Sequence, residues 1–192
     1  MLRILGIDPG TRATGFAVIE QTGRRLSVCE SGVIRLDQQP ELSQRLAQLD
    51  RRLYEIVMQW RPMVVAVEDI FTHQNVRSAL LLGHARGVAL AVAGRAELPV
   101  QPYAPATVKQ AVAGHGRADK LQIQRMVQVL LALSVAPATD EADALAVAIC
   151  HAMSRGVVRA EAPAATVAAA RSPSARWRGA AGGRSVRRRG DP

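Results

Sequence analysis

The sequence has few aromatic residues, few cysteines and no pairing of metal-binding histidines. Two Phe, two Tyr and two Trp in 192 residues leave the filling of the core mainly to aliphatic side chains. The two cysteines, Cys29 and Cys150, lie in apolar segments without CxxC spacing, so neither a disulfide scaffold nor a zinc site is indicated. The four histidines are scattered, with no pair at the helical spacing that zinc sites use.

Long hydrophobic runs are also missing from the sequence. No uninterrupted apolar run reaches the length of a membrane span, and the N-terminus enters a strand-like run without the charged and cleavable regions of a signal peptide. We therefore expect a cytoplasmic protein with no membrane partner. The composition, 48% hydrophobic and 21% charged, suits one α/β domain with a sizeable core and a modest appendage.

The net charge of +9 and the sequence pI near 11.1 favour a polyanionic partner over the alternative of a membrane surface. Nine Arg and only two acids fall between His151 and Pro192, so most of the positive surplus lies in the C-terminal part. We predict a folded domain over residues 1–157 and a basic, disordered tail over 158–192. Such a tail would increase DNA association non-specifically, or would only keep the chain soluble.

Hydrophobic periodicity and turn residues predict five strands and several helices. The predicted strands cover 2–8, 14–20, 26–36, 63–68 and 98–103, and the predicted helices cover 41–60, 76–95, two short pieces after 103, and 138–153. Three strands followed by alternating helices and strands favour an α/β layer sandwich, with helices on a mixed five-stranded sheet. The helix 76–95 has so little polar surface that it needs partners on several sides.

Four carboxylates lie where a predicted strand ends or a predicted helix begins. Asp8 ends the first strand before a Pro-Gly turn, and Glu68 ends the fourth strand. Asp140 and Asp143 open the last helix and, three positions apart, share one helix face. We therefore expect all four to point toward one site at the edge of the sheet.

Converging carboxylates repel one another and take up protons unless a hard divalent cation neutralises them. Ligand sets made only of oxygen favour magnesium or manganese over zinc. In a two-metal site of this type, one ion activates a water and the other stabilises the leaving oxygen of an in-line phosphoryl displacement. The four acids thus predict phosphodiester hydrolysis that requires magnesium.

Each acid also has a purely structural interpretation. Asp8 could be a turn residue, Glu68 or Asp69 a solvated strand end, and Asp140 or Glu141 a charge that offsets the helix dipole. Asp69 directly follows Glu68, and successive side chains of a strand point to opposite faces. We therefore leave Asp69 outside the predicted site.

A set of short motifs runs in one order through about residues 1–155. They are Gly6-Ile7-Asp8-Pro9-Gly10 with Thr14-Gly15, Val67-Glu68 with Phe71, Ser78-Ala79-Leu80, Gly83-His84-Ala85-Arg86-Gly87, Val108-Lys109-Gln110, Lys120, and Asp140-Glu141-Ala142-Asp143-Ala144-Leu145-Ala146. With these motifs the sequence resembles the RuvC-type Holliday junction resolvases, members of the RNase H-like superfamily. The first and last motifs are the most specific. One departure is Ala17, where the family usually has glycine after an aromatic residue.

The resemblance implies an RNase H-like fold and assigns roles to the matching positions. Asp8, Glu68, Asp140 and Asp143 would be the catalytic acids and would bind two magnesium ions, for which manganese could substitute. Phe71 would insert into the junction or stack on its bases, unless it only caps the edge of the sheet.

Basic residues are almost all arginine, because Lys109 and Lys120 are the only lysines among 25 basic residues. Both match lysine positions of the family, which lie near the scissile phosphate and the DNA backbone. A compact ammonium suits developing phosphoryl charge, although either lysine could be an ordinary solvated one. Arg77 and Arg86 are weaker candidates for phosphate contact, with a solvated helix face as the alternative.

The function implied is a structure-selective endonuclease that resolves four-way DNA junctions in recombination and repair. A homodimer would make two symmetric nicks and leave 5′-phosphate and 3′-hydroxyl ends, because two equivalent sites can face two equivalent strands. The helix 76–95 would be wholly internal or, as the resemblance favours, would pack on the sheet and on the same helix of the second subunit. The resemblance also implies branch-migration partners of the RuvA and RuvB type.

Two other functions stay open at this point. The chain could be a junction-binding module without catalytic activity, because four acids do not by themselves establish competent geometry. The turn Asp8-Pro9-Gly10-Thr11 with Gly15 also resembles the first phosphate loop of actin-like ATPases and sugar kinases. Those enzymes use two such loops, and this sequence has one.

Overall fold

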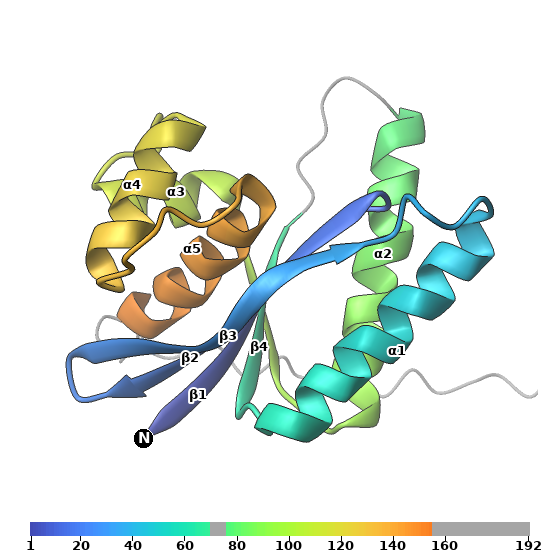
Figure 1. Ribbon diagram of the computed structural model, residues 1–192, viewed down its shortest axis with the longest axis horizontal. Helices are drawn as coiled ribbons and strands as arrows, with labels where there is room; N and C mark the ends of the chain where they lie inside the picture. The colour runs from blue at the N-terminus through green and yellow to red at the C-terminus, as the bar shows by residue number, and fades with distance from the viewer. Residues whose placement is uncertain (70–75, 155–192) are drawn as a thin grey trace, which may run out of the picture. The chain divides into compact units, whose positions relative to one another are not determined.

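A mixed five-stranded sheet forms the centre of the domain (Figure 1). The computed structural model describes residues 1–69 and 76–154. The strands are β1 (Leu2–Asp8), β2 (Ala13–Thr22), β3 (Arg25–Arg35), β4 (Val64–Glu68) and β5 (Val100–Tyr103), in the spatial order β3-β2-β1-β4-β5. Strand β2 is antiparallel to both of its neighbours, β1 and β3, whereas β4 runs parallel to β1 and β5 parallel to β4. The predicted strand set and mixed sheet are therefore confirmed.

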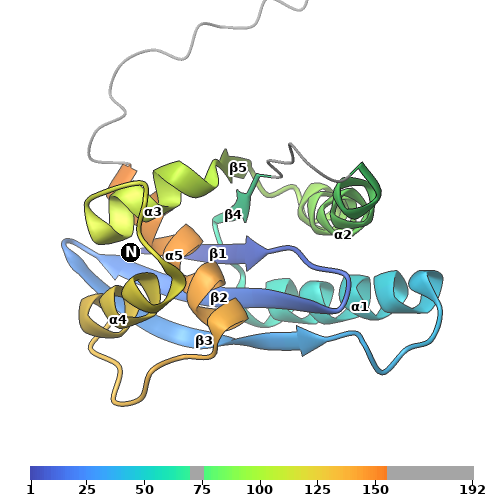
Figure 2. The same cartoon turned by 90° about the horizontal axis from the view of Figure 1, so that it is seen from above.

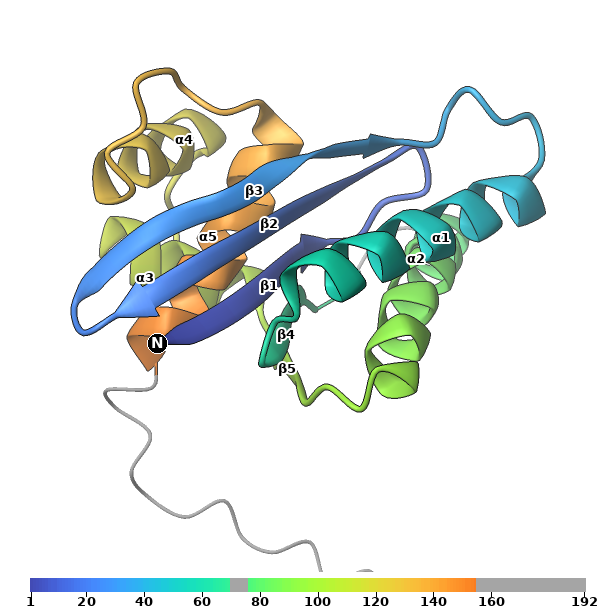
Figure 3. The same ribbon diagram turned by 60° about the horizontal axis from the view of Figure 1, so that its bottom comes forward.

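Five helices cover the sheet in two groups. They are α1 (Leu42–Trp60), α2 (Val76–Arg95), α3 (Pro105–Ala113), α4 (Lys120–Leu130) and α5 (Thr139–Ser154). Figures 1 and 3 show α1 and α2 on one side of the sheet and α3, α4 and α5 on the other. Figure 2 shows α2 nearly end on, while α1 lies along the sheet. This arrangement is the layer sandwich that the sequence predicts.

Alternation along the central strands divides the core into two layers. Ile4 packs with the helices α3 to α5, whereas Leu5 and Ile7 pack with α1 and α2. Because successive side chains of a strand alternate between faces, Asp8 continues the face of Ile4. In β4, Val64 and Ala66 also belong to the α5 layer, so Glu68 continues that same face. The register of the core thus sends both acids to one side.

Helix boundaries follow local signals in the sequence. Helix α1 ends where Arg61 takes a left-handed conformation, φ 45°, directly before Pro62. Helix α4 begins with a capping box in which the Asp119 carboxylate accepts a hydrogen bond from Gln122 N at 2.8 Å. Strand β5 starts at Val100, two residues later than predicted, because the backbone N–H of Leu98 still bonds to the end of α2 through Ala93 O at 2.9 Å.

Helix α2 is only partly covered by the described residues. Its buried side is made of Ala85, Ala89, Val92 and Ala93, while Val76 and Leu80 are 87% and 63% exposed. By length and composition this helix could cross a membrane, contrary to the expectation that no segment would reach that length. Buried helices of soluble proteins satisfy the same criterion, and one side of α2 packs in the core beside the sheet.

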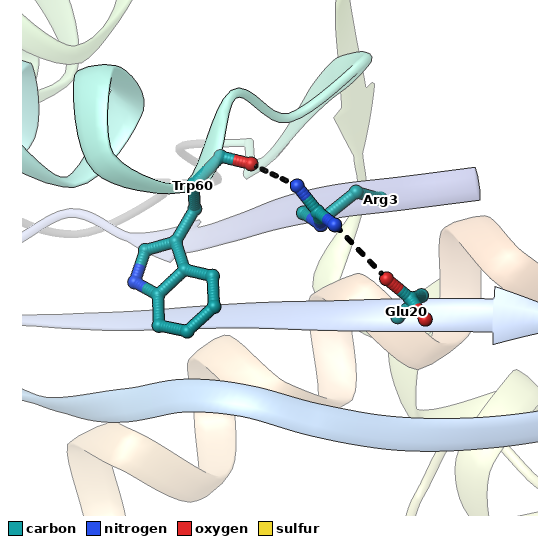
Figure 4. A network of polar contacts seen from close by, with 3 residues as sticks. All are labelled: Arg3, Glu20 and Trp60. Atoms are coloured by element: carbon teal, nitrogen blue, oxygen red, sulfur yellow. Dashed lines mark hydrogen bonds and ion pairs between the residues drawn. The ribbon is translucent and has the colours of Figure 1, made fainter. Parts of the chain in front are cut away.

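At the amino end of β1, charged groups are paired across three elements (Figure 4). Arg3 donates to Trp60 O of α1 at 2.5 Å and to Glu20 Oε2 of β2 at 3.1 Å. The indole Nε1 of Trp60 donates in turn to Glu30 of β3. These bonds fasten the end of α1 to the sheet, at the end opposite to Asp8.

Candidate active site

Two neighbouring strands bring Asp8 and Glu68 together. Strands β1 and β4 are parallel with Ile7 opposite Val67, so the acids that follow leave the sheet at the same edge. The two carboxyl groups are hydrogen-bonded to each other, and this contact contributes to the raised pKa of Asp8. Behind them, the buried hydroxyl of Thr14 donates to Gly10 O at 2.7 Å and accepts from Gly10 N at 3.1 Å. These bonds fix the turn that follows Asp8.

Helix α5 brings the other two acids to the sheet because two strand glycines let it approach. A Cβ atom on Gly15 would lie 1.9 Å from the backbone oxygen of Asp140, and one on Gly6 would lie 2.3 Å from Ala144 O. No side chain fits in either place. These two glycines were not predicted as site-forming residues, although glycine inside an apolar strand is a known sign of close backbone approach.

The acid pair of α5 divides between two positions. Asp143 lines the same cavity as Asp8 and Glu68. Asp140 is not among the lining residues, but it lies near enough for its charge to raise the pKa values of Asp8 and Asp143. Glu141 serves the helix N-terminus instead, because it accepts hydrogen bonds from Ala138 N at 3.1 Å and from Ser31 Oγ of β3 at 2.6 Å.

The cavity has a volume of about 290 Å³ and lies between the sheet edge and the helices α3, α4 and α5. It combines three acids, two lysines and an apolar wall. Its lining residues are Asp8, Glu68, Pro105, Val108, Lys109, Lys120, Ile123, Asp143 and Ala146. Lys120 Nζ lies 3.7 Å from Asp143 Oδ2, and its side chain is 74% exposed. Lys120 therefore lies at the solvent-facing rim of an acidic pocket, whereas Lys109 lines it as a half-buried residue.

The acids are held close enough to disfavour full ionisation. Burial, together with the charges of Glu68, Asp143 and Asp140, raises the pKa of Asp8 to about 8. Burial also raises the pKa values of Glu68 and Asp143, whereas the charges of Lys120 and Lys109 lower both. In the absence of a cation the cluster retains protons in a range where isolated carboxylates would be ionised.

This donor set fits a hard divalent cation. All of its candidate ligands are carboxylate oxygens, and a cation would take the place of the proton shared by Asp8 and Glu68. Within residues 1–69 and 76–154, no group of three or more His, Cys, Asp or Glu side chains is already arranged around a single ion position. The support for magnesium binding at this cluster is therefore the chemistry of its oxygen donors. The number of ions stays a prediction.

The candidate DNA-contacting residues fall in different places. Lys109 and Lys120 lie at the cavity, as expected. Arg77 is exposed in the first turn of α2 and is not a lining residue of the cavity. Phe71 lies outside the described residues, as does the proposed boundary between domain and tail. Arg86 pairs with Asp69 at 3.1 Å, so its predicted alternative as a freely solvated arginine is wrong.

The chain matches a known family along most of its described length. Residues 4–151 match the family model of crossover junction endodeoxyribonuclease RuvC. A crossover junction endodeoxyribonuclease RuvC from Halorhodospira halophila is 50% identical over 155 residues, which are 81% of this chain and 92% of the relative. A solved structure of Thermus thermophilus RuvC superimposes with a TM-score of 0.73 at 35% identity, covering 81% of this chain and 96% of the other. Thermus thermophilus RuvC in complex with Holliday junction substrate gives 0.77 at 34% identity, covering 82% and 96%.

Proposed function

This chain belongs to the RuvC family of crossover junction endodeoxyribonucleases, and from that membership we propose that it resolves four-way DNA junctions by hydrolysing phosphodiester bonds at the acidic cavity. The observation that carries the proposal is the convergence of Asp8, Glu68 and Asp143 with two lysines in one pocket. Paired nicks on symmetric strands, with 5′-phosphate and 3′-hydroxyl ends, would follow. We propose recombination and repair as the biological setting and the cytoplasm as the location.

Magnesium, with manganese as a substitute, would be held by Asp8, Glu68, Asp143 and Asp140, two ions per site. When bound, it would supply Lewis-acid activation of water and stabilisation of the leaving oxygen. The chain's own contribution is to hold the carboxylates so close together that ionising all of them is unfavourable. Binding a cation would relieve their repulsion. The apolar wall formed by Val108, Ile123 and Ala146 limits water around the reacting phosphate.

The two lysines suit the phosphate side of the reaction. Lys109 and Lys120 are ammonium groups that line the acidic pocket, where they would attract the DNA backbone and offset phosphoryl charge. We propose Phe71 as a residue that stacks on junction bases and Arg77 as a phosphate contact farther from the cut. Branch-migration proteins of the RuvA and RuvB type are further proposed partners.

A homodimer is supported by the exposed stripe of α2, which consists of Val76, Leu80, Gly83 and Gly87. The spacing of four, three and four residues puts them on one side of the helix. All four are exposed in the described chain, and a Cβ on either glycine would meet no atom within 4 Å. Two copies of α2 could pack closely along this stripe, which would give two active sites for two equivalent strands.

Cleavage of a synthetic mobile four-way junction tests the proposed function. The full chain is incubated with the junction or with linear duplex, in magnesium or in EDTA, beside Asp8→Asn. We expect paired, ligatable nicks on the junction only, dependent on metal and reduced by about 100-fold or more in Asp8→Asn. Tight binding with no cutting by the unmodified chain would favour the junction-binding module. Indifference to the junction would reopen the nucleotide-phosphate alternative.

Light scattering after gel filtration tests the dimer. Leu80→Glu places a charge in the exposed stripe of α2 and should convert a dimer into a folded monomer that no longer makes paired nicks. Val129→Glu is a matched control, because Val129 is 71% exposed on α4, outside the stripe. A dimer that survives Leu80→Glu, or that is lost equally in Val129→Glu, would contradict this interface.

A further inference from the structure

The carboxyl end of β4 is held on two sides. Glu68 faces the cavity, and Asp69, the next residue, turns to the opposite face of the sheet, as the alternation predicts. There Asp69 Oδ1 lies 3.1 Å from Arg86 Nη2 of helix α2. On the other side, the backbone N–H of Asp69 donates to Tyr103 O of β5 at 2.8 Å. The residue that follows the catalytic glutamate is thus fastened to both a strand and a helix.

Arg86 is well placed to act as a fixed support. Its side chain is 23% exposed, and it lies on α2 next to Ala85, which is fully buried in the layer between the helix and the sheet. Asp69 is 49% exposed, so the pair adds little to global stability. Its effect is geometric, because β4 makes its last pairing at Glu68 opposite Tyr103 and the ion pair restrains the chain immediately beyond.

A second ion pair on the same helix provides a comparison. Arg95, at the other end of α2, lies 2.7 Å from Asp50 of α1, with side-chain exposures of 53% and 36%. It joins the two helices to each other and does not contact a strand end. The Arg86 pair differs because it joins α2 to the residue adjacent to Glu68.

We propose that Arg86 is a positioning residue for the active site, which acts through Asp69 to hold Glu68 in the orientation that the metal cluster requires. This inference rests on the proposed function, since it takes Glu68 as a metal ligand. Loss of the ion pair should leave the fold intact and weaken metal binding at the cavity. Groups that orient a metal ligand typically change metal affinity by about 10- to 100-fold when they are removed.

The test measures Mn²⁺ affinity of the full chain by electron paramagnetic resonance, without DNA. We expect Asp69→Asn and Arg86→Gln each to weaken Mn²⁺ binding by about tenfold, while both variants keep the unmodified circular dichroism spectrum. The double variant should be no weaker than either single one, because both substitutions break the same link. Arg86→Lys should restore part of the affinity, and Arg95→Gln, the matched control, should leave it unchanged.

Cleavage assays separate this inference from the proposed function. In the two variants, the magnesium concentration for half-maximal junction cleavage should rise in proportion to the Mn²⁺ dissociation constant. Unchanged Mn²⁺ affinity in folded Asp69→Asn and Arg86→Gln overturns the inference, as does equal weakening by Arg95→Gln. If the unmodified chain binds Mn²⁺ but cuts no junction, the proposed function fails, and the variant affinities still decide the role of Arg86.

Discussion

The two ends of strand β1 carry charged side chains under opposite conditions. At the amino end, Arg3 donates to Glu20 and to the last carbonyl of α1, so that opposite charges and a helix end satisfy one another. At the carboxyl end, Asp8 lies beside Glu68, Asp143 and Asp140, and burial together with these like charges raises its pKa to about 8. The paired charges at the amino end stabilise the fold, whereas the carboxylates at the carboxyl end repel one another.

The difference distinguishes charged side chains that serve the fold from charged side chains that serve a functional site. A network that serves only the fold pairs its charges in the chain itself, as the Arg3 end does. The cluster at Asp8 has too few positive groups, since Lys120 is mostly exposed and 3.7 Å from Asp143. In the proposed function, a bound cation would supply the missing positive charge. Functional sites often show this kind of cost to stability.

The largest effect is expected when helix α5 is moved away from the acidic end of β1. Gly15→Ala would place a Cβ 1.9 Å from Asp140 O, so the helix that carries Asp140 and Asp143 must shift. Displacing reacting groups by about 1 Å can slow catalysis by about 100-fold, and the overpacking should cost about 1–3 kcal/mol. Single-turnover junction cleavage and thermal unfolding measure the two effects.

Gly94→Ala is the matched control for this substitution, because a Cβ there meets no atom within 4 Å. It should retain full cleavage and, as an alanine in a helix, slightly raise the melting temperature. Normal cleavage by folded Gly15→Ala would show that the close approach of α5 to the sheet is not needed for the reaction.

Varying pH without metal should sharpen the contrast at the acidic end. The pKa of Asp8 is about 8 in the folded chain and 3.8 as the ordinary value, so between these pH values the folded state binds more protons than the unfolded one. The free energy of unfolding should therefore fall as pH rises from about 4 to about 8, by roughly 1–3 kcal/mol. Chemical denaturation in EDTA across this range measures it.

Magnesium should reverse this trend, because a cation replaces the shared proton. Its stabilising effect should be small near pH 5 and grow toward pH 8. The proposed repulsion between the carboxylates would be contradicted if the free energy of unfolding in EDTA rose steadily over this pH range. A magnesium effect that is equal at both pH values would also contradict it.

The smallest predicted effects have opposite signs at the two ends. Arg3→Met removes two hydrogen bonds from a charged donor and should lower the free energy of unfolding by about 1–3 kcal/mol, with unchanged cleavage by the folded protein. Asp8→Asn removes a repelled charge and should leave stability equal or slightly higher in EDTA at pH 8. Urea denaturation of both variants measures the pair, and a loss of stability in both would remove the distinction between the ends.

Most of the fold was predictable from local patterns. The strands and helices follow from apolar periodicity, and α1 ends at Arg61 before Pro62 as predicted. The turn of Asp69 away from the site followed from strand alternation and is confirmed by its pairing with Arg86.

The role of Glu141 was open in the sequence, and its bonds to Ala138 and Ser31 decide for the helix N-terminus. The suitability of α2 for a membrane was misjudged, because a helix interrupted by isolated charges can still be apolar on average.

Local sequence was enough to predict which elements form and which carboxylates end them, because periodicity, turns and caps depend on neighbouring residues. The folded chain, by contrast, was needed to show that Asp8, Glu68 and Asp143 line one cavity and that Asp140 does not line it. That outcome depends on how closely α5 approaches Gly6 and Gly15, on the parallel register of β1 and β4, and on packing between residues more than a hundred positions apart. Such contacts leave no periodic signal in a single sequence, because each is set by the shape of two surfaces that meet only in the folded chain.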